Sequence, residues 1–136
     1  MTIVMSQAQG KVPVTILRID GDLDASNYLD VIARAREAYE AGTRAMLIDM
    51  SNMPFMASSG LVALHSIALL LQGEEPPDPE YGWAAFHSLE RGPGSSTLTC
   101  VKFLNPQPRV ERSLKMAGFD RFFEICTDQE TAIASF

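Results

Sequence analysis

Polar and apolar residues alternate near the amino end of the chain, and this pattern predicts a pair of strands. Residues 12–19 alternate and are rich in β-branched side chains, as is typical of a strand. A second strand at residues 2–5 can pair with it through the turn-prone Gln-Ala-Gln-Gly segment at 7–10. Residues 20–22, Asp-Gly-Asp, have the composition of a turn, so we expect the strand to stop there.

The rest of the chain shows two kinds of apolar pattern. Spacings of three and four residues predict amphipathic helices, and short continuous apolar runs predict strands buried on both faces. In chain order these are a helix from Ser26 or Asn27 to Gly42, a strand at 45–50, a helix from Ser58 or Ser59 to about Gln72, a strand at 98–104, a helix carrying Val110, Leu114 and Ala117 and ended by Gly118, a strand at 122–126, and a last helix capped by Asp128. Strands alternating with helices predict an α/β layered domain with parallel crossovers.

Residues 72–97 interrupt this alternation. The stretch is rich in proline and glycine, and its first half is acidic. It is too short to be a domain, so we expect one domain over residues 1–136 with a long loop or insertion at about 72–97. Trp83, Phe86 and Leu89 fall at helical spacing and predict one short helix, which either docks a partner or packs on the domain as a lid.

Composition and charge exclude several classes of function. The formal net charge of −6 argues against nucleic acid or anionic lipid as the main ligand, because both require a basic surface. The longest apolar stretch, about residues 61–71, carries His65 and Ser66 and is too short to span a bilayer, and the amino end does not resemble a signal peptide. Cys100 and Cys126 are interpreted as small buried apolar residues of a protein in a reducing cytosol.

The sequence offers little support for catalysis. Ser58 and Gly60 supply half of a hydrolase nucleophile elbow, but Met56 stands where the other glycine is required. His65 lies roughly 10 Å further along the predicted helix, too far to hydrogen-bond Ser58 as a base, and His87 lies in the insertion. No phosphate-binding glycine loop or metal-ligand spacing is present. We therefore expect neither an enzyme nor a cofactor or metal site.

The serine pair Ser58-Ser59 follows a buried strand and opens a helix. Amide groups at a helix start are unpaired and attract anions. A phosphate on one of these hydroxyls would add close to two negative charges and break a partner interface by repulsion while leaving the domain folded. A plain helix cap is the other interpretation of these serines, and the two roles can coexist.

Several blocks of sequence together resemble a known family. They are Asp20-Gly21-Asp22-Leu23-Asp24, Leu47-Ile48-Asp49-Met50-Ser51, Phe55-Met56-Ala57-Ser58-Ser59-Gly60-Leu61, Lys115-Met116-Ala117-Gly118-Phe119 and Phe122-Phe123-Glu124-Ile125. Their order and spacing resemble the STAS domain of anti-sigma factor antagonists over nearly the whole chain outside residues 72–97. The resemblance implies the STAS (SpoIIaa-like) α/β fold, a mixed β-sheet of four to five strands with about four helices packed mainly on one face.

The resemblance also implies partner switching. In this family the antagonist binds an anti-sigma factor that is also a serine kinase, and this binding frees a sigma factor. Phosphorylation of the first serine of the pair ends the binding, and a phosphatase restores it. Phosphorylation is thereby expected at Ser58, with Ser59 as the second choice, in a cytoplasmic protein. The partner-binding residues that the resemblance implies are Leu23, Asp24, Ser26, Met56, Ala57, Ser58, Ser59, Gly60 and Leu61.

A second interpretation stays open. The family usually has aspartate where this chain has Ala57, and some STAS domains act without phosphorylation, as scaffolds or as subunits of transport or stress-signalling complexes. The serine pair favours the switch, and Ala57 favours the scaffold. Neither interpretation includes nucleic acid or insertion into a membrane. The sequence leaves open the identity of the partner, nucleotide binding and the oligomeric state, with a dimer among the options.

Overall fold

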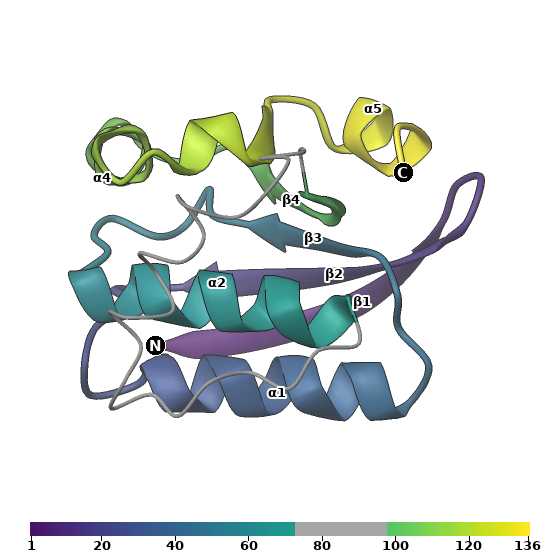
Figure 1. Cartoon of the computed structure of the whole chain (residues 1–136), viewed down its shortest axis with the longest axis horizontal. Coiled ribbons are helices and arrows are strands. Elements are labelled where there is room, and N and C mark those ends of the chain that lie inside the picture. Colours follow the sequence, from purple (N-terminus) through teal and green to yellow (C-terminus); the bar gives the residue numbers. More distant parts are fainter. Residues whose placement is uncertain (73–97) are drawn as a thin grey trace.

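A five-stranded sheet runs through the structure, a computed structural model that describes residues 1–72 and 98–136 (Figure 1). The strands are β1 (Thr2–Gln9), β2 (Pro13–Asp20), β3 (Met46–Asp49), β4 (Leu98–Leu104) and β5 (Phe123–Cys126). They follow one another across the sheet in chain order. β1 pairs antiparallel with β2, and the remaining pairings are parallel. The predicted mixed sheet is confirmed.

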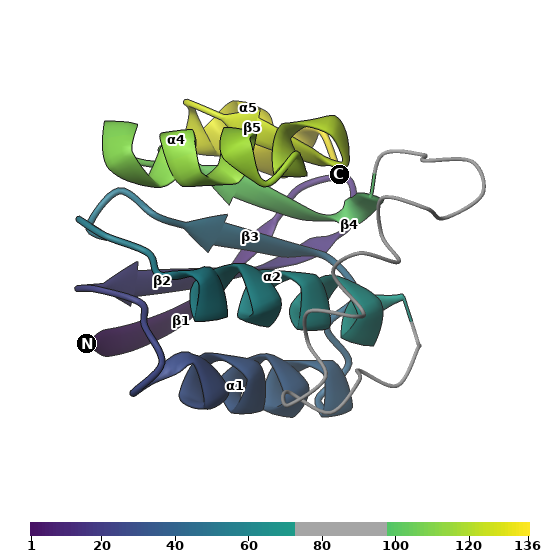
Figure 2. The ribbon, with the colours of Figure 1, turned by 60° about the vertical axis from the view of Figure 1, so that its left-hand side comes forward.

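The helices cover the sheet unequally. They are α1 (Tyr28–Glu40), α2 (Ser58–Leu71), α4 (Pro108–Met116) and α5 (Gln129–Ala134), with a short 3-10 helix, η2, at Phe119–Arg121. Residues of α1, α2 and α4 share the larger core on one face, whereas α5 packs over part of the other face. Figure 2 shows α1 and α2 together on the near side of the sheet. The predicted α/β fold, with helices mainly on one face, is therefore confirmed.

Burial on both faces explains the apolar runs of the central strands. In β2, Leu17 and Ile19 enter the larger core, while Val14 and Ile16 face the smaller cluster under α5. All residues of β3 are buried. Parallel strands covered on both sides read as continuous apolar segments instead of alternating ones, which is the pattern that predicted β3.

The amino-terminal hairpin is longer than the sequence predicted. β1 continues to Gln9 and pairs with β2 along its whole length, so the turn lies at residues 10–12. The polar residues that suggested an earlier turn are strand residues on an open edge of the sheet, where polar side chains face solvent. Gly10 permits a close approach at the turn, because a β-carbon there would lie 2.6 Å from the carbonyl oxygen of Ile133 in α5.

The helix starts differ in how they are capped. Asn27 occupies the cap position of α1, but its side chain does not bond to the helix. Ala57 occupies the cap position of α2, so the helix begins at Ser58 as predicted. Asp128 caps α5, also as predicted: its carboxylate accepts a 2.8 Å hydrogen bond from the Thr131 amide. The hydrogen bonds from Thr131 lower the pKa of Asp128.

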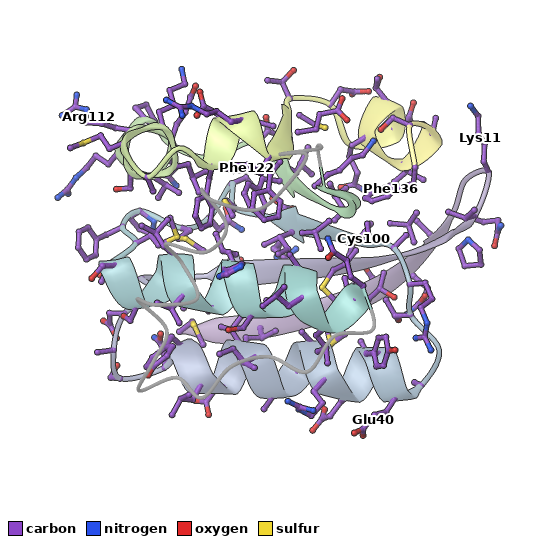
Figure 3. The ribbon with its side chains drawn as sticks, viewed as in Figure 1. Lys11, Glu40, Cys100, Arg112, Phe122 and Phe136 are labelled. Atoms are coloured by element: carbon purple, nitrogen blue, oxygen red, sulfur yellow. The ribbon has the colours of Figure 1, made fainter. Side chains whose placement is uncertain are left out.

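Other sequence expectations fall partly on described residues. Cys126 is buried, Cys100 is half-buried, and both are free thiols whose pKa is raised by burial. Cys126 thus agrees with the interpretation as a small buried apolar residue, whereas Cys100 on β4 is only partly covered (Figure 3). His87 and the short helix predicted from Trp83, Phe86 and Leu89 lie outside the described residues.

Candidate functional site

Two loops meet beyond the carboxyl-terminal ends of β2 and β3, on the left in Figure 1. One leads from β2 to α1 and the other from β3 to α2. Leu23 and Met56 form a parallel bridge between them. The Leu23 amide donates to the Phe55 carbonyl (3.0 Å), and the Ala57 amide donates to the Leu23 carbonyl (2.9 Å). This pairing adds one parallel bridge beyond the ends of β2 and β3, and it fixes the start of α2 against the first loop.

The loop before α1 is held by its own polar groups. Asp24 Oδ1 accepts hydrogen bonds from the Ser26 amide (2.9 Å) and the Ser26 hydroxyl (2.5 Å). The Asp24 amide donates to Asn27 Oδ1, and Asn27 Nδ2 donates to the Asp22 carbonyl, each at 2.9 Å. The bonds from Ser26 lower the pKa of Asp24, so the carboxylate is ionised at neutral pH. These contacts give the loop a defined shape beside the start of α2.

The two serines at the start of α2 have different surroundings. Ser58 is the first residue of the helix and is exposed. Ser59 is half-buried, and its hydroxyl oxygen is buried without a hydrogen-bond partner among the described residues. Ala57 has no side-chain acceptor for the first amide groups of the helix, and such amides carry the positive end of the helix dipole. The Ser58 hydroxyl is therefore accessible next to an uncapped, anion-attracting helix start.

Gly60 brings the loop pair onto the first turn of α2. A β-carbon at this position would overlap Met56 Cγ and lie 3.1 Å from Leu23 Cγ and Cδ2. Leu23 is fully buried and Met56 is nearly so. The side chains of Leu23 and Met56 thus contact the helix backbone at Gly60, and this close contact requires a residue without a β-carbon.

An aromatic ring and an arginine flank the second loop. Phe55 is 38% exposed, and the Arg109 guanidinium carbon of α4 lies 5.5 Å from its ring centroid, within cation–π range. Gln107 Nε2 donates to the Ser51 carbonyl (2.8 Å), which joins residues 56 positions apart in the sequence. Sequence patterns gave no signal for Arg109 or Gln107. Phe55 begins the sequence block that resembles the family, but it was not among the predicted partner-binding residues.

The predicted partner-binding residues divide into accessible and buried groups. Ser26 and Ser58 are exposed, and Asp24, Ala57 and Ser59 are partly exposed. The buried members are Leu23, Met56, Gly60 and Leu61. An incoming protein can touch the first group directly, whereas the second group can act only through the shape of the loops and the helix start.

The histidine on the same helix as Ser58 is buried. His65 is 3% exposed inside α2, and burial lowers its pKa, so the imidazole is neutral and turned into the core. Across residues 1–72 and 98–136, no group of three or more His, Cys, Asp or Glu side chains is placed to hold a metal ion. None of the helices in this part of the chain is long and apolar enough to cross a membrane. The Ser58 hydroxyl thus lies on the surface at the start of α2.

Fold and site together define a class of protein: a small α/β domain whose candidate site is made by two paired loops and the start of the helix after the central strand. The profile of the STAS domain family matches residues 5–74, slightly more than half of the chain. The chain belongs to the STAS domain family.

Solved structures with the same fold carry related descriptions. An anti-sigma factor antagonist from Mycobacterium paratuberculosis is 18% identical, with a TM-score of 0.65 over 98% of this chain and 92% of that one. A putative anti-sigma factor antagonist from Thermotoga maritima is 14% identical, with a TM-score of 0.70 over 96% and 91%. The Bacillus cell fate determinant SpoIIAA in its phosphorylated form is 14% identical, with a TM-score of 0.54 over 96% of each chain. At these identities the likeness shows the fold. Among curated proteins, none matches the sequence.

Proposed function

We propose that this STAS domain is an anti-sigma factor antagonist that binds its partner through the paired loops and the start of α2, and that phosphorylation of Ser58 ends the binding. The observation that carries the proposal is the exposed Ser58 hydroxyl at the uncapped start of α2. Two structural neighbours described as anti-sigma factor antagonists, and a third described as a cell fate determinant in its phosphorylated form, support it. The partner is an anti-sigma factor with serine kinase activity, and a phosphatase reverses the modification, all in the cytoplasm.

Charge explains why one phosphate would end partner binding without unfolding the domain. A phosphoserine carries close to two negative charges, and the positive end of the helix dipole at Ser58 stabilises them. The domain therefore tolerates the modification. A partner surface shaped for a neutral hydroxyl beside the exposed Phe55 ring would instead have to desolvate the phosphate. The activity proposed is binding, with no chemical step carried out by this chain.

The test is phosphorylation by kinase-type anti-sigma factors from the source organism. The purified full chain is incubated with ATP and each candidate, and the product is read by intact mass and peptide mapping. One phosphate on Ser58, lost in Ser58→Ala and kept in Ser59→Ala, is the expected result. Ser59→Ala is the matched control because it removes the neighbouring hydroxyl, whose oxygen is buried. A phosphate that maps to another residue would contradict the proposal.

A scaffold that works without phosphorylation is the second candidate. Ala57 favours it, because the cap position of α2 has no carboxylate beside the serine. A scaffold would bind its partner equally well with Ser58→Asp and would take up no phosphate from any of the kinases. Those two results together would replace the switch with the scaffold.

A further inference from the structure

β1 is an edge strand with an open outer side: no other strand among residues 1–72 and 98–136 pairs there. Its residues, Thr2–Gln9, include no charge and no proline, and its pairing with β2 has no bulge. Natural edge strands usually carry a charge, a proline or a bulge, which prevents pairing with other chains. Every second residue of an antiparallel edge strand directs both backbone polar groups outward. β1 therefore presents a continuous row of groups able to accept another strand.

Apolar side chains gather along this edge. Large apolar residues are exposed at six positions in the described part of the chain. Half of these lie in β1, just before it or in the hairpin turn that follows it: Val4, Met1 and Val12. Ile3 and Met5 point to the opposite face and are only partly covered by the core. The strand thus offers apolar surface on both faces of the sheet, which pairing with a further strand would bury.

Two hollows lie between β1 and α1 along the same edge. The first, of about 430 Å³, is lined by Met1, Ile3, Asp30, Ala33, Arg34 and Glu37. The second, of about 790 Å³, includes Met5, Gln7 and Glu37 in its lining. Alternate residues of β1 therefore border successive hollows. Backbone groups on an edge, with recesses for every second side chain of an added strand, are the arrangement that β-augmentation uses.

We propose that β1 is the interface of a homodimer, in which the β1 strands of two copies pair antiparallel about a twofold axis at Val4. This register sets Val4 opposite Val4 and Ile3 opposite Met5 of the second copy. Apolar residues then face apolar residues, and no charged side chains of β1 meet, because the strand has none. The inference is independent of any role for Ser58.

The charges of α1 select a second copy as the occupant. Glu37 lines both hollows and Arg34 lines the one beside Ile3, so the proposed axis at Val4 lies level with the Arg34–Glu37 turn of α1. In one chain these side chains lie 3.7 Å apart, with Arg34 half-exposed and Glu37 largely exposed. Two α1 helices running antiparallel across the axis bring Arg34 of each copy next to Glu37 of the other. This self-complementary charge pattern matches the twofold symmetry of the strand pairing.

The test measures the mass of the full chain by sedimentation over a wide range of concentration. The expected species has twice the chain mass of 14.9 kDa. Val4→Lys places two ammonium groups opposite each other at the axis and should weaken association by about tenfold or more. Met116→Lys is the matched control, because Met116 is 83% exposed on α4, outside β1 and its hairpin. It should leave the dimer intact.

A charge exchange keeps the test decisive if Val4→Lys folds poorly. Arg34→Glu and Glu37→Arg should each weaken the dimer, and the double variant should restore it, since the exchanged charges again face each other. A wild-type chain that stays monomeric at every concentration would overturn the proposal. So would a dimer indifferent to Val4→Lys, or an edge that is protected from hydrogen exchange only when a different protein is bound.

Discussion

Leu23 and Met56 lie side by side in a parallel bridge, and both side chains press against the backbone of Gly60. Three separate segments of the chain thus meet at one point: the loop before α1, the loop before α2 and the first turn of α2. The exposed Ser58 lies two residues before Gly60 in the same helical turn. The position of that hydroxyl depends on buried contacts that a partner does not touch.

Gly60→Ala is expected to disturb this point. The added methyl would overlap Met56 Cγ, and overpacking of this kind typically costs about 1–3 kcal/mol. Urea denaturation of Gly60→Ala, Met56→Ala and the double variant measures the loss of stability. The double variant should be less destabilised than the sum of the single changes, because Met56→Ala removes the overlapped atom. Strictly additive costs would show that the two residues are not in contact.

Ala57→Asp is expected to stabilise the domain. Ala57 has extended backbone angles (φ −79°, ψ 171°), which suit a cap residue, and it leaves the first amides of α2 without a side-chain acceptor. A capping aspartate typically contributes about 1 kcal/mol. Thermal unfolding of Ala57→Asp and Ala57→Asn compares a charged cap with a neutral one. Equal or lower stability for both variants would mean that the helix start is already satisfied in another way.

His65 gives the stability a pH dependence of known sign. Burial lowers its pKa in the folded chain below the ordinary value of 6.5, so the unfolded chain binds the proton more readily. The free energy of unfolding therefore carries no protonation penalty from His65 above pH 6.5. It falls as the pH drops from 6.5 towards the pKa of the folded chain, by at most about 1.4 kcal/mol per pH unit. His65→Leu should flatten this slope in denaturation series. If the free energy of unfolding keeps the same slope with pH, other titratable groups cause that slope.

Lys102 is expected to hold the end of the chain on the sheet. It is 4% exposed, and its Nζ donates to the Ser135 carbonyl (3.0 Å) and lies 2.9 Å from the Glu124 carboxylate. Lys102→Met should cost about 1–3 kcal/mol and speed proteolysis of α5, since it removes the charged donor of two hydrogen bonds to Ser135. Glu124→Gln should cost less, because Glu124 is half-exposed. Equal costs for the two variants would contradict this assignment.

Most elements could be predicted because their signals are local. The apolar run at β3, the capping Asp128 and the serine start of α2 each depend on a few neighbouring residues. The extent of β1 could not be predicted in this way. Its polar half is held by pairing with β2, and a backbone ladder leaves little trace in side-chain pattern.

The candidate site shows the same limit. The sequence motif predicted where Ser58 lies, but the division of its neighbours into buried and exposed residues follows from packing. Leu23 belongs to the motif yet is fully buried, whereas Arg109 lies outside every motif and stacks near Phe55. Contacts between segments far apart in the sequence carry no local pattern, so the surface around the serine became visible only in the folded chain.

The central claim concerns charge at Ser58, and affinity for the kinase-type anti-sigma factor tests it most directly. Binding is measured by calorimetry for the wild type, Ser58→Asp and the matched Gln129→Asp, which adds the same charge at an exposed residue that begins another helix, α5. An acid at the start of α2 should leave the stability of the domain unchanged or raise it by about 0.3–1 kcal/mol. The account predicts that Ser58→Asp stays folded and loses most of its affinity, whereas Gln129→Asp keeps its affinity. If Ser58→Asp keeps full affinity for a partner that binds the wild type, the account is contradicted.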